Sequence, residues 1–437
     1  MVDYAFELKN KIKHRSLRIC VVGLGYVGLP LALEFARKSI SITGIEIDKG
    51  RLNAIAKQGR SYVSDVSDKQ LKDLMAQGFF KVSGSFQEVK QADVILVCVP
   101  TPLKGKNLPD ISFIKSAFNS VASFIKKGSL VVLESTTYPG TTEEELEPIF
   151  AQRGLKHGRD YFLAFSPERI DPGNKKYPVQ KIPKVVGGLS AQATKLTALV
   201  YGLIIKKIIP VSSARTAEAV KLLENTFRLI NIGLIDELAM MAHKMNIDIW
   251  EVVRAASSKP FGFMPFFPGP GVGGHCIPKD PLYLHWKAQS FGFYSRFIQL
   301  ASDVINDMPE YIVARLQEAF SGLAKHLRGS KILLIGVTYK KDIKDLRKSP
   351  AIDVITSLKK HGAFVSYADP LIPYLKIANI DLRSIALTET NIKKFDCLII
   401  ATDHSNVDYS YLEKHAKLIF DARNVYKGKN KDKVIRL

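Results

Sequence analysis

Short apolar runs alternate with segments of helical periodicity through the first half of the chain. Residues 18–23 form an apolar run, residues 27–37 show a helical pattern, and residues 41–46 form a second run. Because strands that alternate with helices build a parallel sheet, this pattern predicts a doubly wound α/β domain. Further strands of the same domain are expected at residues 79–82, 93–99, 129–134, 161–165, 184–186 and 206–211.

A much longer helical pattern follows. It extends from residue 214 to residue 245 without a proline and with only Gly233 as a helix breaker, which exceeds the usual length of a globular helix. Its apolar residues lie on more than one face, and a helix that is apolar all round must be covered on all sides. We therefore expect a homodimer or a larger homo-oligomer formed through this helix. The apolar residues are Leu222, Leu223, Phe227, Leu229, Ile230, Ile232, Leu234, Ile235 and Leu238.

Alternation of strands and helices returns in the last third of the chain, where a strand at residues 331–336 opens a second block. The whole pattern predicts an α/β fold with two Rossmann-like doubly wound domains, joined by a long helix and a helical middle domain. The expected domains are residues 1–212, 213–325 and 326–437. The remaining expected elements are helices at 249–256, 281–291 and 296–320, strands at 363–367, 396–401 and 418–421, and a frayed tail at 427–433.

Composition and charge narrow the class of protein. Of the 437 residues, 46% are hydrophobic and 24% charged, as in soluble globular proteins. Four cysteines without paired spacing predict neither a disulfide framework nor a metal site, which favours a reducing, cytoplasmic compartment. The net charge of +21 suits an anionic substrate. Because the basic residues are spread along the chain, a solvated surface is the simpler interpretation, and we predict neither a nucleic-acid nor a membrane partner.

A glycine-rich loop at residues 23–28 lies directly between the first strand and the first helix. Gly23, Gly25 and Gly28 have the spacing that makes the turn, admits a pyrophosphate and packs helix on strand. Glu46 ends the next strand, where an acid binds the ribose hydroxyls and favours NAD over NADP, while Arg51 nearby weakens that preference. The loop therefore predicts an NAD site that includes Tyr26 and Val27. The alternative is a glycine-rich turn in a Rossmann-like fold that binds no nucleotide.

Two further loops are expected at the carboxyl ends of strands, where ligands bind in such sheets. They carry Thr101, in the segment VPTP, and Thr136, in the segment ESTT. Each threonine is either a ligand contact or a turn and cap residue.

The segment at residues 268–281 contains four glycines and four prolines, so it forms a rigid loop instead of a helix or a central strand. It carries Cys276, followed by Lys279 and Asp280, which is the setting of an activated nucleophile. The alternative is a turn that happens to contain a cysteine. The other three cysteines, at positions 20, 98 and 397, lie in apolar strand-like runs where a thiol is a small buried hydrophobe.

Two weaker signals accompany this loop. Lys221 and Asn225 are four residues apart and share one face of the long helix. They form either a solvated edge or part of a site. Glu168 and Arg169 follow a predicted strand in the segment SPER.

Together these segments resemble the UDP-glucose/GDP-mannose dehydrogenase family. The resemblance covers nearly the whole chain, in the order GLGYVG, VPTP, ESTT, SPER, KLLENTFR, GVGGHCIPKDP and GVTYKKDIKDLRKSP. It implies an NAD-binding domain, a central dimerisation domain with the cysteine loop, and a UDP-sugar-binding domain. It also implies oxidation of the C6 hydroxyl of a UDP-sugar to a carboxylate, for surface polysaccharide precursors. The cysteine loop looks most like the branch that acts on UDP-N-acetylhexosamines, which implies UDP-GlcNAc, with UDP-GalNAc, UDP-ManNAc and UDP-glucose as alternatives.

The resemblance also implies roles for individual residues. Cys276 matches the nucleophile, and Lys221, Asn225 and Asp280 match residues beside the reacting carbon. Glu168 and Thr136 match residues that position water and substrate. Whether Glu168 or Asp280 transfers the proton stays open. The remaining matches are Lys340 for the nucleotide-sugar, Arg347 near the cofactor, and Arg169, Phe267 and Gly273 along the substrate.

The chain departs from the family pattern in two places, one of them a segment of three residues and the other a single residue. Asp171, Pro172 and Gly173 intervene where UDP-glucose enzymes carry a second acid, and Phe267 replaces a basic residue of some relatives. Both changes imply a reshaped sugar pocket. A non-catalytic nucleotide-sugar-binding protein is the rival of another class, and the intact Cys276 argues against it.

Overall fold

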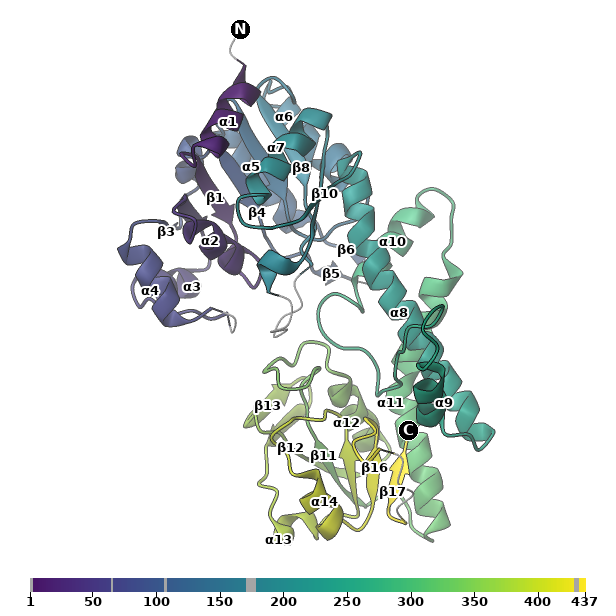
Figure 1. The fold of residues 1–437 in the computed structure, drawn as a ribbon. Coiled ribbons are helices and arrows are strands. Elements are labelled where there is room, and N and C mark those ends of the chain that lie inside the picture. The colour runs from purple at the N-terminus through teal and green to yellow at the C-terminus, as the bar shows by residue number, and fades with distance from the viewer. Residues whose placement is uncertain (1–2, 64–65, 106–107, 170–177, 428–431) are drawn as a thin grey trace. The chain divides into compact units, whose positions relative to one another are not determined.

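The computed structural model describes residues 3–63, 66–105, 108–169, 178–427 and 432–437 (Figure 1). The chain divides into two compact units. The first consists of Met1–Glu224 and Leu282–Phe293, and the second of Asn225–Pro281 and Tyr294–Leu437. The predicted division into three domains stays a prediction.

An eight-stranded sheet forms the centre of the first unit, in the order β10-β9-β8-β7-β4-β1-β2-β3. Its strands are parallel except for one pairing, in which β9 runs antiparallel to β8 with Ala164 opposite Gly188. The expected parallel sheet therefore contains one antiparallel pairing, which is possible because an antiparallel neighbour needs no helical crossover. The strands are β1 (Arg18–Val22), β2 (Ser41–Ile45), β3 (Phe80–Ser83), β4 (Val94–Val97), β7 (Ser129–Leu133), β8 (Tyr161–Phe165), β9 (Lys184–Gly188) and β10 (Ile208–Pro210).

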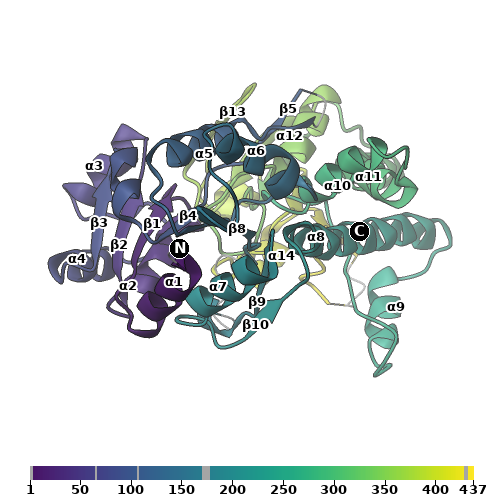
Figure 2. The same ribbon diagram turned by 90° about the horizontal axis from the view of Figure 1, so that it is seen from above.

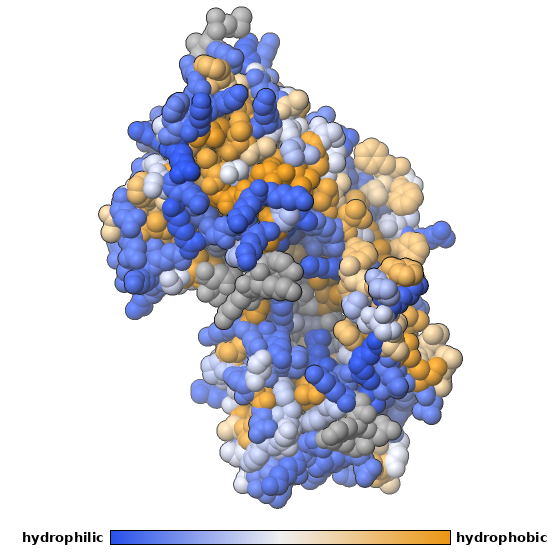
Figure 3. Space-filling view, in the orientation of Figure 1, coloured by the Kyte–Doolittle hydropathy of each residue, from blue (hydrophilic) through white to orange (hydrophobic). Residues whose placement is uncertain are grey.

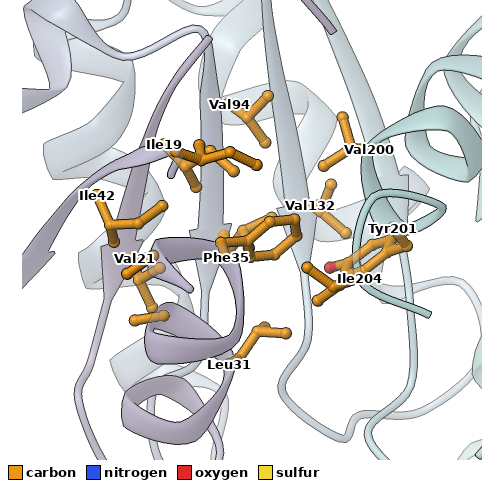
Figure 4. Close-up of a cluster of buried hydrophobic side chains, with 14 of the residues drawn as sticks. Ile19, Val21, Leu31, Phe35, Ile42, Val94, Val132, Val200, Tyr201 and Ile204 are labelled. Atoms are coloured by element: carbon orange, nitrogen blue, oxygen red, sulfur yellow. The ribbon is translucent and has the colours of Figure 1, made fainter. Parts of the chain in front are cut away.

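Helices cover both faces of this sheet, as the view in Figure 2 shows. Helices α1 (Tyr4–Lys13), α2 (Gly28–Ala36) and α7 (Ala191–Tyr201) lie on one face, and α5 (Ser112–Phe124) and α6 (Glu147–Ala151) on the other. On the face covered by α1, α2 and α7, Phe35 and Tyr201 pack on strand residues such as Val132 (Figure 4). The doubly wound fold is confirmed.

Shorter elements complete the first unit. Several helices begin at a side-chain cap; for example, Asp48 accepts a hydrogen bond from Arg51 N, and Ser67 from Gln70 N. These elements are α3 (Lys49–Ala56), α4 (Asp68–Ala76), η1 (Phe86–Gln91), the hairpin of β5 (Leu103–Lys104) and β6 (Leu108–Pro109), the π-helix η2 (Thr141–Leu146), η3 (Val179–Lys181) and α10 (Asp280–Gln289).

The long helix α8 (Ala214–Lys244) agrees with its predicted bounds to one residue. Large apolar side chains remain exposed along one stripe of it, at intervals of four and seven residues, which is the spacing of a helix–helix seam. Figure 3 shows apolar side chains gathered over the helical region on the right of the view. The stripe consists of Leu223, Phe227, Leu234, Met241 and Met245, each at least 44% exposed.

The second unit contains a five-stranded, fully parallel sheet in the order β12-β11-β15-β16-β17. Helices α11 (Arg296–Gly322) and α12 (Pro350–Lys360) pack on one face, and α13 (Glu389–Ile392) and α14 (Tyr409–His415) on the other. The second Rossmann-like domain is therefore confirmed. Its remaining elements are α9 (Ile249–Ala256), β11 (Lys331–Ile335), β12 (Phe364–Ala368), β13 (Tyr374–Ile377), β14 (Ile380–Arg383), β15 (Cys397–Ile400), β16 (Ile419–Asp421) and β17 (Val434–Arg436).

The C-terminus differs from its prediction. Residues 428–431 of the expected frayed tail (427–433) lie outside the described part of the chain. Directly after that tail, β17 pairs with β16, a strand that the sequence analysis did not predict. The Trp250 indole donates to the Leu437 oxygen at 2.8 Å, and Arg436 forms an ion pair of 2.8 Å with Asp248. Both partners belong to α9 or its cap, so this helix fixes the last strand.

The cysteines follow the expected division. Cys20 and Cys397 are buried in strands, Cys98 directly follows β4, and none of the four described cysteines forms a disulfide. Within the described residues, no helix combines the length and the apolar character that a membrane span needs.

We predict that the stripe on α8 mediates a homodimer. Light scattering at micromolar concentration should give about twice the 48.6 kDa of one chain. Leu234→Glu combined with Phe227→Glu should reduce the mass to that of one chain, because charges in the seam lose their hydration. Phe6→Glu, which changes an exposed phenylalanine of α1, is the matched control and should leave the mass unchanged. A wild-type mass near 48.6 kDa would contradict the prediction.

Candidate active site

The loop after β1 has the geometry of a dinucleotide-binding turn. Gly23 has a φ of +88°, and a Cβ on it would lie 2.7 Å from the Cys98 carbonyl oxygen. A Cβ on Gly28 would lie 1.9 Å from the Gly23 oxygen, so both positions require glycine for packing. A Cβ on Gly25 would meet nothing within 4 Å. Gly25 is therefore the position where a pyrophosphate can approach the backbone.

Helix α2 begins beside this open space. Its N-cap residue, Val27, makes no side-chain hydrogen bond, so the cap residue does not occupy the positive end of the helix. Tyr26 is 48% exposed next to it. The residues present therefore fit the pyrophosphate of a dinucleotide.

Glu46 lies where the acid of a ribose site is expected. It is 5% exposed and accepts hydrogen bonds from Leu24 N at 3.3 Å and Asp48 N at 3.0 Å. The Tyr62 hydroxyl lies 3.4 Å from the same carboxylate, and burial followed by the charge of Glu46 raises the pKa of Tyr62. The Arg51 guanidinium lies 5.2 Å from the centre of the Tyr62 ring. Tyr62 thus contacts both Glu46 and Arg51. No sequence motif pointed to Tyr62.

The two threonine loops meet at the carboxyl edge of the sheet. The Ser135 hydroxyl donates to the Val99 oxygen at 2.8 Å and joins the loop after β7 to the loop after β4. Thr136 is half-buried beside this link, whereas Thr101 is buried and its carbonyl oxygen accepts from the Tyr283 hydroxyl at 2.9 Å. Both threonines therefore lie on the ligand side of the sheet, and their contacts with a ligand stay predictions.

Glu168 lies on the same edge, after β8. The Lys221 ammonium donates to its backbone oxygen at 2.6 Å, so the structure brings these two predicted residues together. Its carboxylate lies 3.5 Å from the buried Lys184, which also pairs with Glu134 at 2.6 Å. The sequence interpretation missed Lys184 and Glu134, because they are 50 residues apart and form no recognisable motif.

Arg169 has protein partners in the structure. Its guanidinium donates to Glu224 at 3.1 Å and to the Pro183 oxygen at 2.8 Å. Its predicted contact with substrate stays a prediction. Asp171, Pro172 and Gly173 lie outside the described residues.

The cysteine loop, in the second unit, owes its glycines to close packing. A Cβ on Gly273 would lie 2.5 Å from the Tyr339 side chain, and Gly274, with a φ of +87°, donates its N–H to the Arg347 oxygen at 2.9 Å. Gly273 is thus explained by packing against the loop that follows β11. A substrate contact of Gly273 stays a prediction.

Cys276 begins a turn that leads into α10. Its carbonyl oxygen accepts from Asp280 N at 2.8 Å and from Lys279 N at 3.1 Å. The turn buries Asp280, whose carboxylate accepts from the Asn225 amide at 2.6 Å. Cys276, Asp280 and Asn225 are therefore brought together within one unit, and Lys221 lies one helical turn before Asn225 on α8.

The other predicted substrate and cofactor residues of the second unit surround this loop. Lys340 is half-buried, and its carbonyl oxygen accepts from the Thr338 hydroxyl at 3.0 Å. Arg347 forms an ion pair of 2.6 Å with Asp345. Phe267 is 49% exposed and stacks on Trp250, with ring centres 5.8 Å apart.

A cavity of about 410 Å³ lies at the carboxyl edge of the second sheet. Three of its lining residues, Lys341, Arg423 and Lys427, are cations. Such a lining suits a phosphorylated ligand.

The dinucleotide turn, the acid at the end of β2 and the thiol beside a buried acid–amide pair define an NAD-dependent dehydrogenase with a cysteine in its candidate active site. Models of three family domains match the chain. They are described as the NAD-binding domain (residues 17–205), the central domain (215–307) and the UDP-binding domain (333–428) of the UDP-glucose/GDP-mannose dehydrogenase family. The chain belongs to this family, and its third domain and its relatives indicate an NAD-dependent oxidoreductase that acts on a UDP-sugar.

Individual relatives carry different substrate names. The UDP-N-acetyl-D-glucosamine 6-dehydrogenase of Pseudomonas aeruginosa is 37% identical over 92% of this chain and 94% of its own. The NDP-N-acetyl-D-galactosaminuronic acid dehydrogenase of Ralstonia nicotianae is 31% identical over 94% and 96%. The solved structure of the UDP-D-ManNAc dehydrogenase of Pyrococcus horikoshii matches with a TM-score of 0.85 and 32% identity, over 94% and 97%.

We predict that the glycines of the cofactor loop separate by function. Gly25→Val should weaken NAD⁺ binding at least tenfold, about 1.4 kcal/mol, without changing Tm, because its side chain enters only the space of the cofactor. Gly28→Ala should instead lower the stability by about 1–3 kcal/mol through overpacking. Gly322→Ala, where a Cβ meets nothing, is the control. Fluorescence titration with NADH and thermal unfolding measure both effects. Normal NADH binding by Gly25→Val would contradict the assignment.

We also predict a preference for NAD⁺ over NADP⁺, because Glu46 repels a 2′-phosphate. The ratio of kcat/KM values for the two cofactors measures it. Glu46→Gln should narrow the ratio, since the amide keeps the size and removes the charge. Equal values for the wild type would mean that Arg51 outweighs Glu46.

Proposed function

We propose that the protein oxidises the C6 hydroxyl of a UDP-N-acetylhexosamine to a carboxylate, with UDP-GlcNAc as the favoured substrate. The observation that carries this proposal is the Cys276 turn, which buries Asp280 against Asn225 in an NAD-dependent dehydrogenase. The relative that is 37% identical supports the choice of sugar by its name. The product would serve as a precursor of surface polysaccharides, in the cytoplasm as the cysteine pattern predicts.

Bound NAD⁺ supplies the hydride acceptor for two successive oxidations. After the first, the Cys276 sulfur adds to the C6 aldehyde and forms a thiohemiacetal. Loss of the second hydride leaves a thioester. Water then adds to the acyl carbon, the C–S bond breaks, and the carboxylate is released with the thiolate regenerated.

Charged residues are assigned to these steps in the proposed mechanism. The Lys221 ammonium stabilises the oxyanion on C6. We assign the proton of the attacking water to Glu168, because its side chain is 14% exposed whereas that of Asp280 is 0% exposed. Asp280, held by Asn225, orients the sugar hydroxyl and the thiol turn.

The cationic cavity of the second sheet is the proposed site of the diphosphate. Lys341, Arg423 and Lys427 offer three charges for it, and the domain model that matches this region is described as UDP-binding. Lys340 and Arg347, the predicted contacts of the nucleotide-sugar and the cofactor, lie on the loop that also carries Lys341.

The alternatives differ in the sugar or in the class of protein. UDP-ManNAc, UDP-GalNAc and UDP-glucose are the rival substrates, and relatives named for mannosamine and galactosaminuronic acid match at 33% and 31% identity. Phe267, with its exposed ring, is a candidate for sugar discrimination. The rival class, a nucleotide-sugar-binding protein without activity, predicts no NADH formation.

A panel of UDP-hexoses tests this proposal. UDP-GlcNAc should give the highest kcat/KM, a uronic acid product and about two NADH per sugar consumed, because each sugar loses two hydrides. One NADH per sugar with a ketone product would contradict the mechanism. Preference for another UDP-N-acetylhexosamine would change the assigned substrate and leave the proposed mechanism intact.

Cys276→Ser tests the covalent route. It should fold with a wild-type Tm, because a half-buried loop thiol contributes little packing. Net turnover should fall by about 10³-fold or more, since the thioester can no longer form. Cys20→Ser changes a buried strand thiol and is the control: it should alter Tm and leave turnover per folded molecule unchanged. Near-wild-type NADH production by Cys276→Ser would exclude the covalent route.

A further inference from the structure

Lys184 is a buried ammonium in the first unit with an unusual set of partners. It opens β9, and its side chain is 5% exposed. The Nζ atom lies 2.6 Å from Glu134 Oε2 and 3.2 Å from the Pro167 oxygen. It also lies 3.5 Å from Glu168 Oε2. One cation therefore contacts both the carboxylate of Glu168 and the peptide oxygen just before it.

The charges around Lys184 explain why it stays protonated. Burial opposes its charge, but the nearby carboxylates of Glu134 and Glu168 outweigh burial and hold the pKa of Lys184 above its usual value. Burial in turn raises the pKa of Glu134, against the effect of the lysine. Burial also keeps the pKa of the Cys98 thiol well above its usual value, so Cys98 adds no competing charge.

Glu134 is fixed on its other side. The Tyr201 hydroxyl donates to Glu134 Oε1, and the Tyr201 ring lies 5.1 Å from the ammonium of Lys184. The Lys184 ammonium is thus held by Glu134 after β7 and by Tyr201 of α7, in addition to its contact with Glu168. The Arg169 N–H donates to Glu168 Oε1 at 2.6 Å, and the Lys221 ammonium donates to the backbone oxygen of Glu168.

We propose that Lys184 is a positioning residue for hydrolysis of the thioester, an inference that rests on the proposed function. Its ammonium contacts the Glu168 carboxylate and holds it in position beside the second carboxylate, Glu134. In the hydrolytic step the water oxygen bonds to the acyl carbon, its proton moves to Glu168, and the C–S bond to Cys276 breaks. Glu168 then releases the proton to solvent. The ammonium also offsets the negative charge of Glu134 next to Glu168, and an opposite charge at this distance favours a carboxylate that can accept the proton.

The test uses the full-length enzyme with UDP-GlcNAc and NAD⁺ in rapid-quench and steady-state assays. Lys184→Met should still release about two NADH per active site in a first burst, while steady-state turnover falls about 100-fold, the size of a general-base contribution. Intact mass after acid quench should show the acyl adduct on Cys276. The acid limb of the kcat–pH profile should shift to higher pH by about one unit, because the variant lacks the cation that offsets the charge of Glu134 beside Glu168.

Three further variants separate positioning from folding. Lys184→Arg should keep most of the turnover, because it preserves the charge. The double variant Lys184→Met/Glu134→Gln should move the acid limb back and recover turnover at least tenfold, since it removes the repelling carboxylate together with the cation. This double variant also keeps the test valid if Lys184→Met alone does not fold, because a buried pair can be replaced by neutral groups. Lys195→Met changes an exposed lysine of α7 and should alter neither the NADH burst nor the steady-state rate.

The outcomes distinguish this inference from the function on which it rests. Equal loss of burst and steady-state rate, or wild-type turnover by Lys184→Met, would overturn the role of Lys184 and leave the proposed function standing. A wild type that forms no NADH with any UDP-hexose would overturn both.

Discussion

The common level at which the parallel strands end decides where chemistry can occur in the first unit. Val22 pairs with Val97, which pairs with Leu133. Leu133 in turn pairs with Phe165, so four neighbouring strands end together. These strands are buried between helices, and only the loops at their carboxyl edge can carry polar groups to a ligand. The cofactor glycines, both threonine loops and Glu168 share this edge for that reason.

A second constraint, close backbone packing, shapes the cysteine loop. Its glycines leave room for Tyr339 and for the segment that follows it, and the loop begins where the Gly269 N–H donates to buried Asp236 at 3.0 Å. Burial raises the pKa of Asp236 to about 8, against the hydrogen bond from Gly269. The loop is thus fixed at its start by α8 and along its length by the segment that follows β11. Such rigidity suits the proposed nucleophile, which must keep one position while the thiohemiacetal forms, is oxidised and is hydrolysed.

The fold could largely be predicted from the sequence, because buried parallel strands and a long helix give strong periodic signals. The antiparallel pairing of β9 and the last strand, β17, could not, since both depend on partners distant along the chain. Motifs located the cofactor turn and Cys276, because local glycine spacing imposes their geometry. Lys184 and Tyr62 belong to no motif, and their importance lies only in the charged groups that the fold places beside them.

The central claim is that one carbon stays bound to the enzyme through two oxidations and is released by water. Turnover of UDP-GlcNAc in H₂¹⁸O tests it most directly, with mass spectrometry of the uronic acid product. Hydrolysis of an enzyme-bound thioester introduces one water oxygen, so the account predicts one ¹⁸O in each carboxylate. A free aldehyde exchanges its oxygen through its hydrate, so two labels would contradict the account, as would a product without any label.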